Sequence, residues 1–414
     1  MVVLEASPVS VDTRRVSAAV AAAGLSSFAL LYAPQPVLPQ LAAAYRLDPG
    51  TASLAIGVAT ASLAVAVLPI AWVAGMLGRR RVILWSVVVS AVLGLLLPLA
   101  PSFPVLLVMR GIQGVAIAGF AGVAAAYLAD AVGTARLAGA VGAMIAGNSV
   151  GGMLGRLGAG FAAEPLGWHG SLPAVAGVAL VCALFTAATL PRDSGVRHKP
   201  PRHSPPEDRQ ARHDVGTEEH AGGDAEAGGG AAWMRVGLVV PVVVGALGMG
   251  AFVALYNAAA FRLAAPPLSL APAAASLVFL SYAMGTASSA AAGRLAARLG
   301  RTPTLVTALL ITVAGSVLTA HQSLPVIAVG FAVLTAGFFA AHAIANAWVT
   351  ADAPPAARGR AAGTYTLCYY LASGAGGTAG GIVYGHAGWT WLVAMTSAWL
   401  LLAALAVLVT SRRR

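Results

Sequence analysis

Long apolar stretches alternate with short polar segments along this chain of 414 residues. A helix of about 20 apolar residues, rising 1.5 Å per residue, crosses a hydrocarbon core about 30 Å thick. The pattern predicts twelve such membrane-spanning helices, at 16–38, 52–75, 82–100, 104–129, 136–162, 171–190, 236–260, 272–297, 302–320, 324–350, 358–384 and 389–410. We therefore expect an all-α polytopic membrane protein.

The two halves of the chain repeat one another. Gly-Arg-Arg-Arg at 78–81 follows the second apolar stretch, and Gly-Arg at 300–301 follows the eighth, a shift of 222 residues (300 minus 78). Gly-Trp at 167–168 recurs at 388–389, a shift of 221 residues (388 minus 167). Parallel repeats of this kind are typical of membrane proteins that fold as two similar helix bundles. The repeat predicts two pseudo-symmetric six-helix bundles.

A polar tract separates these bundles. Residues 192–232 are rich in proline, glycine, histidine and charged side chains and have no apolar periodicity, so we expect a disordered linker there. The two bundles are then expected at 16–191 and 233–411, with a tail at 1–15 and a basic tail at 412–414.

The basic residues predict an orientation. With the N-terminus in the cytoplasm, only Arg46 and Arg262 of the 25 Lys and Arg residues lie in outer loops, and Arg110 and Arg156 lie within spans. Lys and Arg gather on the cytoplasmic side of membrane proteins. We expect both termini and the linker to be cytoplasmic, in a multi-pass protein of the plasma membrane.

Composition excludes a soluble domain, because 58% of the residues are apolar and 9% are charged, against about 25% charged in soluble domains. The net charge of +11 does not indicate a nucleic-acid partner, since the basic residues lie at helix ends and in loops. The sequence has no phosphate-binding loop, Ser/His/Asp cluster or Cys/His metal spacing, which predicts no enzyme activity, no cofactor and no metal. We expect a monomer whose partners are a small-molecule substrate and the lipid bilayer.

The basic loops resemble a signature of the major facilitator superfamily. The stretch 71–80 keeps the signature's last glycine and two basic residues, but Gly75 stands where the family has Asp. The second copy, at 293–302, has Ala297 at that position. The resemblance implies a gating loop at this place, and the missing acids leave Arg80 without its expected local partner.

Two spans add to this resemblance. Residues 110–114 are similar to the family's Arg-x-x-Gln-Gly motif, and residues 147–152 are similar to the Gly-Pro-x-x-Gly-Gly signature of proton-driven exporters. More narrowly, the stretches 147–156, 255–263 and 337–342 resemble the YnfM-type branch of bacterial inner-membrane exporters among the drug:proton antiporters. The resemblance implies secondary active transport by alternating access, driven by a proton gradient, in a bacterial inner membrane.

Glycine is abundant in the fifth and eleventh spans, where it allows helix backbones to approach closely. We expect these glycines to form a packed interface between the halves that slides or rocks during transport. The residues expected to act in gating or packing are Gly78, Arg79, Arg80, Gly147, Asn148, Gly151, Gly152, Gly300 and Arg301.

Arg110 and Arg156 are predicted at similar depths within neighbouring spans, where a charge costs about 2.5–3.5 kcal/mol. Three explanations stay open. In the first, each arginine donates to helix carbonyls freed by nearby glycines and to Gln113 or Asn148. In the second, an anion lies between the two arginines. In the third, Arg110 couples proton arrival to transport, as the family motif implies.

His342 lies in the tenth span, with Asn346 one turn further along the same face. It is either a hydrogen-bonded structural residue or a proton carrier, and histidine is the side chain that titrates near neutral pH. We expect Arg110 and His342 to act in coupling. The residues expected to line the cavity are Tyr32, Gln35, Arg110, Gln113, Arg156, Tyr256, Asn257, His342, Asn346 and Tyr369.

A cavity with arginines and without carboxylates favours a small amphipathic or anionic substrate over an organic cation. The sequence thus predicts proton-coupled efflux of such a molecule. Two alternatives stay open: a proton-coupled importer of a small metabolite such as a sugar or organic acid, and a membrane sensor that transports nothing.

Overall fold

The computed structural model describes residues 13–132, 134–191, 236–354 and 357–412. The expected linker at 192–232 and most of the expected tails lie outside these residues. The first half comprises α1 (Thr13–Tyr32), η1 (Gln35–Val37), α2 (Leu38–Tyr45), α3 (Pro49–Leu77), α4 (Arg79–Leu96), η2 (Leu97–Leu99), α5 (Phe103–Ala121), α6 (Ala124–Val132) and α7 (Thr134–Thr189). The second half comprises α8 (Val236–Ala264), α9 (Pro272–Ser276), η3 (Leu277–Ser281), α10 (Tyr282–Leu299), α11 (Arg301–Leu318), α12 (Leu324–Asp352) and α13 (Arg358–Arg412).

Ten helical segments in the described ranges are long and apolar enough to cross a membrane. Two of them, α7 and α13, are interrupted at Gly167 (φ 61°, ψ −175°) and Gly388 (φ 81°, ψ −177°). This conformation is essentially restricted to glycine, which has no Cβ. The two breaks fall between predicted spans, so each long segment supplies two spans and the predicted twelve-helix fold is confirmed.

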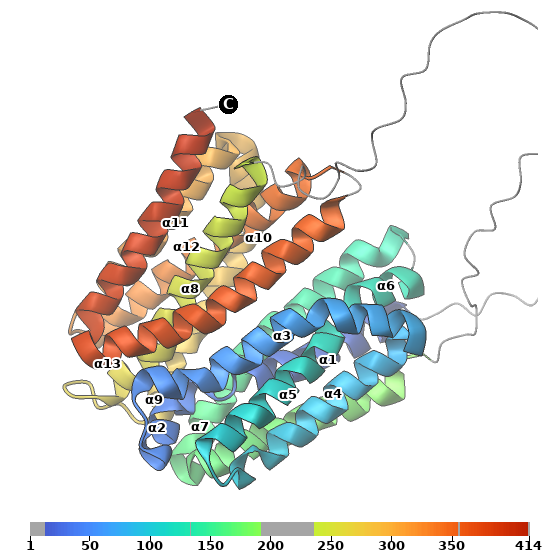
Figure 1. The fold of residues 1–414 in the computed structure, drawn as a ribbon, viewed down its shortest axis with the longest axis horizontal. Helices are drawn as coiled ribbons and strands as arrows, with labels where there is room; N and C mark the ends of the chain where they lie inside the picture. The colour runs from blue at the N-terminus through green and yellow to red at the C-terminus, as the bar shows by residue number, and fades with distance from the viewer. Residues whose placement is uncertain (1–12, 133, 192–235, 355–356, 413–414) are drawn as a thin grey trace, which may run out of the picture.

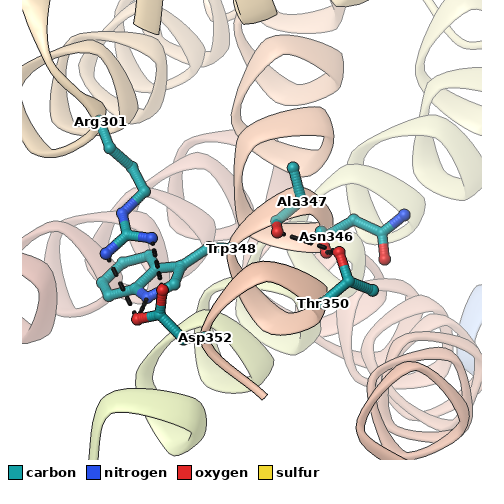
Figure 2. A network of polar contacts seen from close by, with 6 residues as sticks. All are labelled: Arg301, Asn346, Ala347, Trp348, Thr350 and Asp352. Carbon is teal, nitrogen blue, oxygen red and sulfur yellow. Dashed lines mark hydrogen bonds and ion pairs between the residues drawn. The ribbon is translucent and has the colours of Figure 1, made fainter. Parts of the chain in front are cut away.

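The basic turns adopt the same conformation in both halves. Gly78 (φ 92°) ends α3 and precedes α4, and Gly300 (φ 91°) ends α10 and precedes α11. The following arginines each form an ion pair with an aspartate at the end of a later helix, Arg79 with Asp130 and Arg301 with Asp352 (Figure 2). The turns therefore tie α4 to α6 and α11 to α12.

Proline ends the first span. The helix α1 stops at Tyr32, and Pro34, Pro36 and Pro39 follow it, in the segment of η1 and the start of α2. Proline has no backbone N–H and cannot continue a helical hydrogen-bond ladder. The interruption of the ladder lies beside Gln35, the first residue of η1.

The helices form two bundles, each with its own buried apolar core. The bundles converge at the end of the molecule that contains α2 and α9, and α3 and α13 diverge toward their other ends (Figure 1). We call these the converging end and the diverging end. Glycine allows the close approach between the bundles, because a Cβ on Gly57 would lie 3.2 Å from the Gly374 carbonyl oxygen and one on Gly381 would lie 2.6 Å from that of Pro49.

Candidate functional site

A cavity of about 390 Å³ lies between the two bundles. Both halves line it, and most of its surface is aromatic or otherwise apolar. Its polar lining from the first half comes from Tyr32, Asn148, Ser149 and Arg156, and from the second half from Tyr282, Thr286, Tyr369 and Tyr370. Sequence reasoning missed the apolar part, which includes Met249, Phe252, Phe338 and Phe339. Two adjacent phenylalanines in an apolar helix can face a cavity, the protein core or lipid, and the sequence alone does not distinguish these environments.

Arg156 is the charged group of this cavity, and its side chain is 3% exposed. Its Nε donates to Gln35 Oε1 at 2.5 Å and its Nη1 donates to the Gly152 carbonyl at 2.6 Å. The guanidinium also lies 3.9 Å from the ring centre of Tyr32 and 4.6 Å from that of Tyr282. No carboxylate of the described residues forms an ion pair with it. Aromatic faces and neutral oxygens stabilise the cation but leave its charge without a counter-ion.

Gln35 extends this arrangement across the molecule. Its Nε2 donates to Asn257 Oδ1 at 2.7 Å, which joins η1 of the first half to α8 of the second. Both residues are 1% exposed. A hydrogen-bonded chain thus runs from Arg156 on the cavity wall through Gln35 to Asn257 in the other bundle.

Arg110 is fully buried and is not among the residues that line the cavity. Its Nε donates to the Ala55 carbonyl at 2.7 Å and its Nη2 to the Leu31 carbonyl at 2.6 Å. Its Nη1 donates to the Leu30 carbonyl at 3.1 Å and to Gln113 Oε1 at 2.5 Å. All four acceptors belong to the first bundle. This agrees with the first explanation above, in which Arg110 donates to helix carbonyls and to Gln113.

The source of one of these carbonyls differs from the one expected. The Leu30 carbonyl would accept from the N–H of residue 34 in a continued helix, and Pro34 has none. Proline, rather than a nearby glycine, therefore frees the acceptor. Gln113 completes the cluster by donating from Nε2 to the Ser90 carbonyl at 2.8 Å.

His342 is half-buried beside the cavity. Its Nδ1 lies 2.8 Å from the Tyr365 hydroxyl, and its ring centre lies 4.6 Å from that of Tyr369, which lines the cavity. Asn346, one turn further along α12, is exposed. Tyr256 is placed differently, because it is fully buried in the second bundle, with its hydroxyl 2.5 Å from Ser281 Oγ and 2.6 Å from Thr335 Oγ1.

Several glycines of α7 pack against α1 of the same bundle. A Cβ on Gly147 would lie 2.3 Å from the Ala21 carbonyl oxygen, and one on Gly151 would lie 2.3 Å from that of Leu25. Both neighbours belong to α1 of the same half. Gly152 and Asn148 instead line the cavity. Gly160 reaches the other half, because a Cβ on it would lie 2.2 Å from Ser276 Cβ of α9. The close contacts between the halves therefore involve this glycine of α7 as well as those of α3 and α13 described above.

The comparisons with known proteins agree with this geometry. The family model described as Major Facilitator Superfamily matches residues 20–259 and 247–414. The chain belongs to the major facilitator superfamily. It is 32% identical over 396 residues to the uncharacterised MFS-type transporter YybF of Bacillus subtilis, covering 94% of this chain and 92% of that protein. It is 33% identical over 391 residues to the inner membrane transport protein YnfM of Escherichia coli, covering 94% and 89%.

Solved structures of the superfamily show the same fold. A bacterial homologue of the human lysosomal transporter Spinster, in an inward-facing and occupied conformation, has a TM-score of 0.77 at 16% identity and covers 96% of both chains. The human organic anion transporter MFSD10 has a TM-score of 0.60 at 20% identity and covers 96% of this chain and 99% of its own. The protein is therefore a membrane-spanning transporter of this superfamily, and its relatives are named as transporters rather than enzymes.

Proposed function

We propose that this protein exports a small amphipathic or anionic organic molecule by proton-coupled alternating access. The observation that carries the proposal is Arg156, a cation on the cavity wall with no acidic partner among the described residues. A buried charge of this kind is stabilised most by an ion of opposite sign. An anionic substrate supplies that ion, whereas an organic cation would be repelled.

The remaining wall fits the organic part of such a substrate. Phe252, Phe338 and Tyr369 offer ring faces, and the volume of about 390 Å³ suits a molecule of one or two rings. An amphipathic anion would place its charged group against Arg156 and its apolar body against these rings.

The orientation that the basic residues favour is compatible with export. The turns at Gly78 and Gly300 lie at the diverging end, because α3 and α10 both run there from the converging end. Arginine-rich turns favour the cytoplasmic side. We place the diverging end in the cytoplasm, together with both termini and the 192–232 linker. The two bundles are then separated on the cytoplasmic side, from which an exporter takes up its substrate.

A proton carrier is needed within or beside the cavity. The described acidic residues, Asp48, Asp130, Glu164 and Asp352, lie at helix ends or in connections rather than in the middle of a span. His342, hydrogen-bonded to Tyr365 beside the cavity, is then the group we assign to proton coupling. Arg110, held by four acceptors in the first bundle, is assigned a structural role.

Flux measurements in inside-out membrane vesicles with an acidic lumen test this function. The probe is 2-naphthalenesulfonate, a permanent anion that does not follow the pH gradient by passive permeation. We expect accumulation that depends on the gradient and falls at least roughly tenfold in Arg156→Gln, because a charge-assisted contact is lost. No accumulation by the wild-type protein, or equal accumulation by the variant, would contradict the proposal, and accumulation only with an alkaline lumen would favour import.

A further inference from the structure

The hydrogen bond between Gln35 and Asn257 joins the bundles near the converging end. It runs from Gln35 Nε2 to Asn257 Oδ1 over 2.7 Å, and both side chains are buried. The bond must break when the converging end opens, because its donor and acceptor belong to different bundles. In the present conformation it favours the closed converging end.

Arg156 fixes the orientation of the Gln35 amide. A guanidinium group only donates hydrogen bonds, so Gln35 must turn its Oε1 toward Arg156 Nε, as the 2.5 Å contact shows. The amide then has only its NH2 group to offer Asn257. The bond between the bundles is therefore oriented by the same charged group that faces the cavity.

Asn257 has little freedom to replace this bond. Its Nδ2 is buried and has no hydrogen-bond partner among the described residues, and a Cβ on Gly377 would lie 2.6 Å from it. When Gln35 turns away, Asn257 Oδ1 also loses its donor. Two unsatisfied groups in a buried site disfavour this packing, and separation of the bundles with entry of water relieves them.

We propose that Gln35 couples substrate binding to the opening of the converging end. An anion on the Nε edge of Arg156 competes with Gln35 Oε1, frees the Gln35 amide to rotate, and thereby weakens its bond to Asn257. The empty carrier keeps the converging end closed, and the loaded carrier opens it. This inference rests on the proposed function, in which an anion occupies Arg156.

The first test needs no ligand. Spin labels on Ala43→Cys and His386→Cys, two exposed positions at the converging end in opposite halves, report its opening by pulsed electron paramagnetic resonance in a background without Cys182 and Cys368. We expect Gln35→Met and Asn257→Leu each to raise the open population roughly threefold or more. The control Thr335→Val removes a buried hydrogen bond within the second bundle and should leave the distances unchanged. Unchanged distances in both Gln35→Met and Asn257→Leu would overturn the inference.

The second test adds 2-naphthalenesulfonate to the labelled protein. We expect the anion to raise the open population of the wild-type protein and to have a smaller effect in Asn257→Leu, whose bond is already absent. Gln35→Glu should resist the anion, because a carboxylate at position 35 pairs with Arg156 more strongly than the amide oxygen does. Binding of the anion without opening would overturn the coupling. If the anion does not bind but the first test is positive, the proposal of an anionic substrate is wrong. The Gln35–Asn257 contact would still hold the converging end closed.

Discussion

Arg301 and Asp352 form a two-point ion pair, with Nη1 2.9 Å from Oδ1 and Nη2 3.4 Å from Oδ2 (Figure 2). Trp348 contributes to the same cluster, because its Nε1 donates to Asp352 Oδ2 at 2.8 Å and its ring lies 4.4 Å from the Arg301 guanidinium. Arg79 and Asp130 repeat the pair in the first half with the same separation of 51 residues. The aspartates at the ends of α6 and α12 thus pair with Arg79 and Arg301. Arg80, whose local acid is missing, instead donates from Nε to the Leu190 carbonyl at 3.2 Å.

Loss of the second pair should weaken the contact between α11 and α12. We expect Asp352→Asn to lower the free energy of unfolding by about 1 kcal/mol, since the pair is two-point but partly exposed. The midpoint of thermal unfolding in detergent measures this change. Arg298→Ala, at an exposed arginine in the last turn of α10, is the control. Equal midpoints for Asp352→Asn and the wild-type protein would show that the pair does not stabilise the bundle.

The two membrane-embedded arginines should respond differently to the same substitution. Arg110→Met leaves the Leu30 and Leu31 carbonyls without their donor, and we expect a loss of about 2–4 kcal/mol and a low yield of folded protein. Arg156→Met should keep the yield but lower the affinity for 2-naphthalenesulfonate at least roughly tenfold. Size-exclusion chromatography and equilibrium binding measure the two effects. Normal folding of Arg110→Met, with reduced affinity, would instead place Arg110 in the substrate site.

The α1–α7 contact should be sensitive to a single methyl group. In Gly151→Ala the new Cβ would lie 2.3 Å from the Leu25 carbonyl oxygen and 2.5 Å from its Cα, so the helices must separate. We expect a loss of about 1–3 kcal/mol. Gly142→Ala, on the same helix with no atom within 4 Å of the new Cβ, should be neutral or stabilising. The midpoint temperatures of thermal unfolding of the two variants measure this difference. Similar midpoints would contradict the close contact between α1 and α7.

Proton coupling should depend on the imidazole of His342. We expect His342→Gln to lower gradient-driven accumulation of 2-naphthalenesulfonate in inside-out vesicles by roughly tenfold, while exchange without a gradient continues. Tyr365→Phe removes only the hydroxyl partner and keeps the imidazole, so it should retain driven transport. Undiminished driven transport in His342→Gln would exclude His342 as the carrier.

Hydropathy and the internal repeat were sufficient to predict the fold. The repeated Gly-Trp pairs at 167–168 and 388–389 mark two turns whose backbone conformation suits glycine alone. Arg156 could be recognised as unusual because a charge inside an apolar span is costly. The glycine turns and the charge within an apolar span are local features of the chain, so they can be recognised in a single sequence.

The partners of these residues could not be predicted in the same way. Asp352 lies 51 residues from Arg301, and only the packing of α11 against α12 brings them together. Similarly, the sequence does not show that Pro34 frees the Leu30 carbonyl for Arg110, or that Gly147 faces α1 rather than the other bundle. Such contacts depend on helix rotation, which a pattern dominated by small apolar residues does not specify.

Accessibility of the cavity from the two faces of the membrane distinguishes a cavity that opens alternately from one that opens to a single side. Ser149, on the cavity wall, is replaced by cysteine in a chain without Cys182 and Cys368, and a membrane-impermeant thiol reagent is applied to inside-out and right-side-out vesicles. We predict labelling from the cytoplasmic face without ligand, and labelling from the outer face once 2-naphthalenesulfonate is added. Labelling from one face alone under both conditions would contradict a cavity that opens alternately and loads an anion.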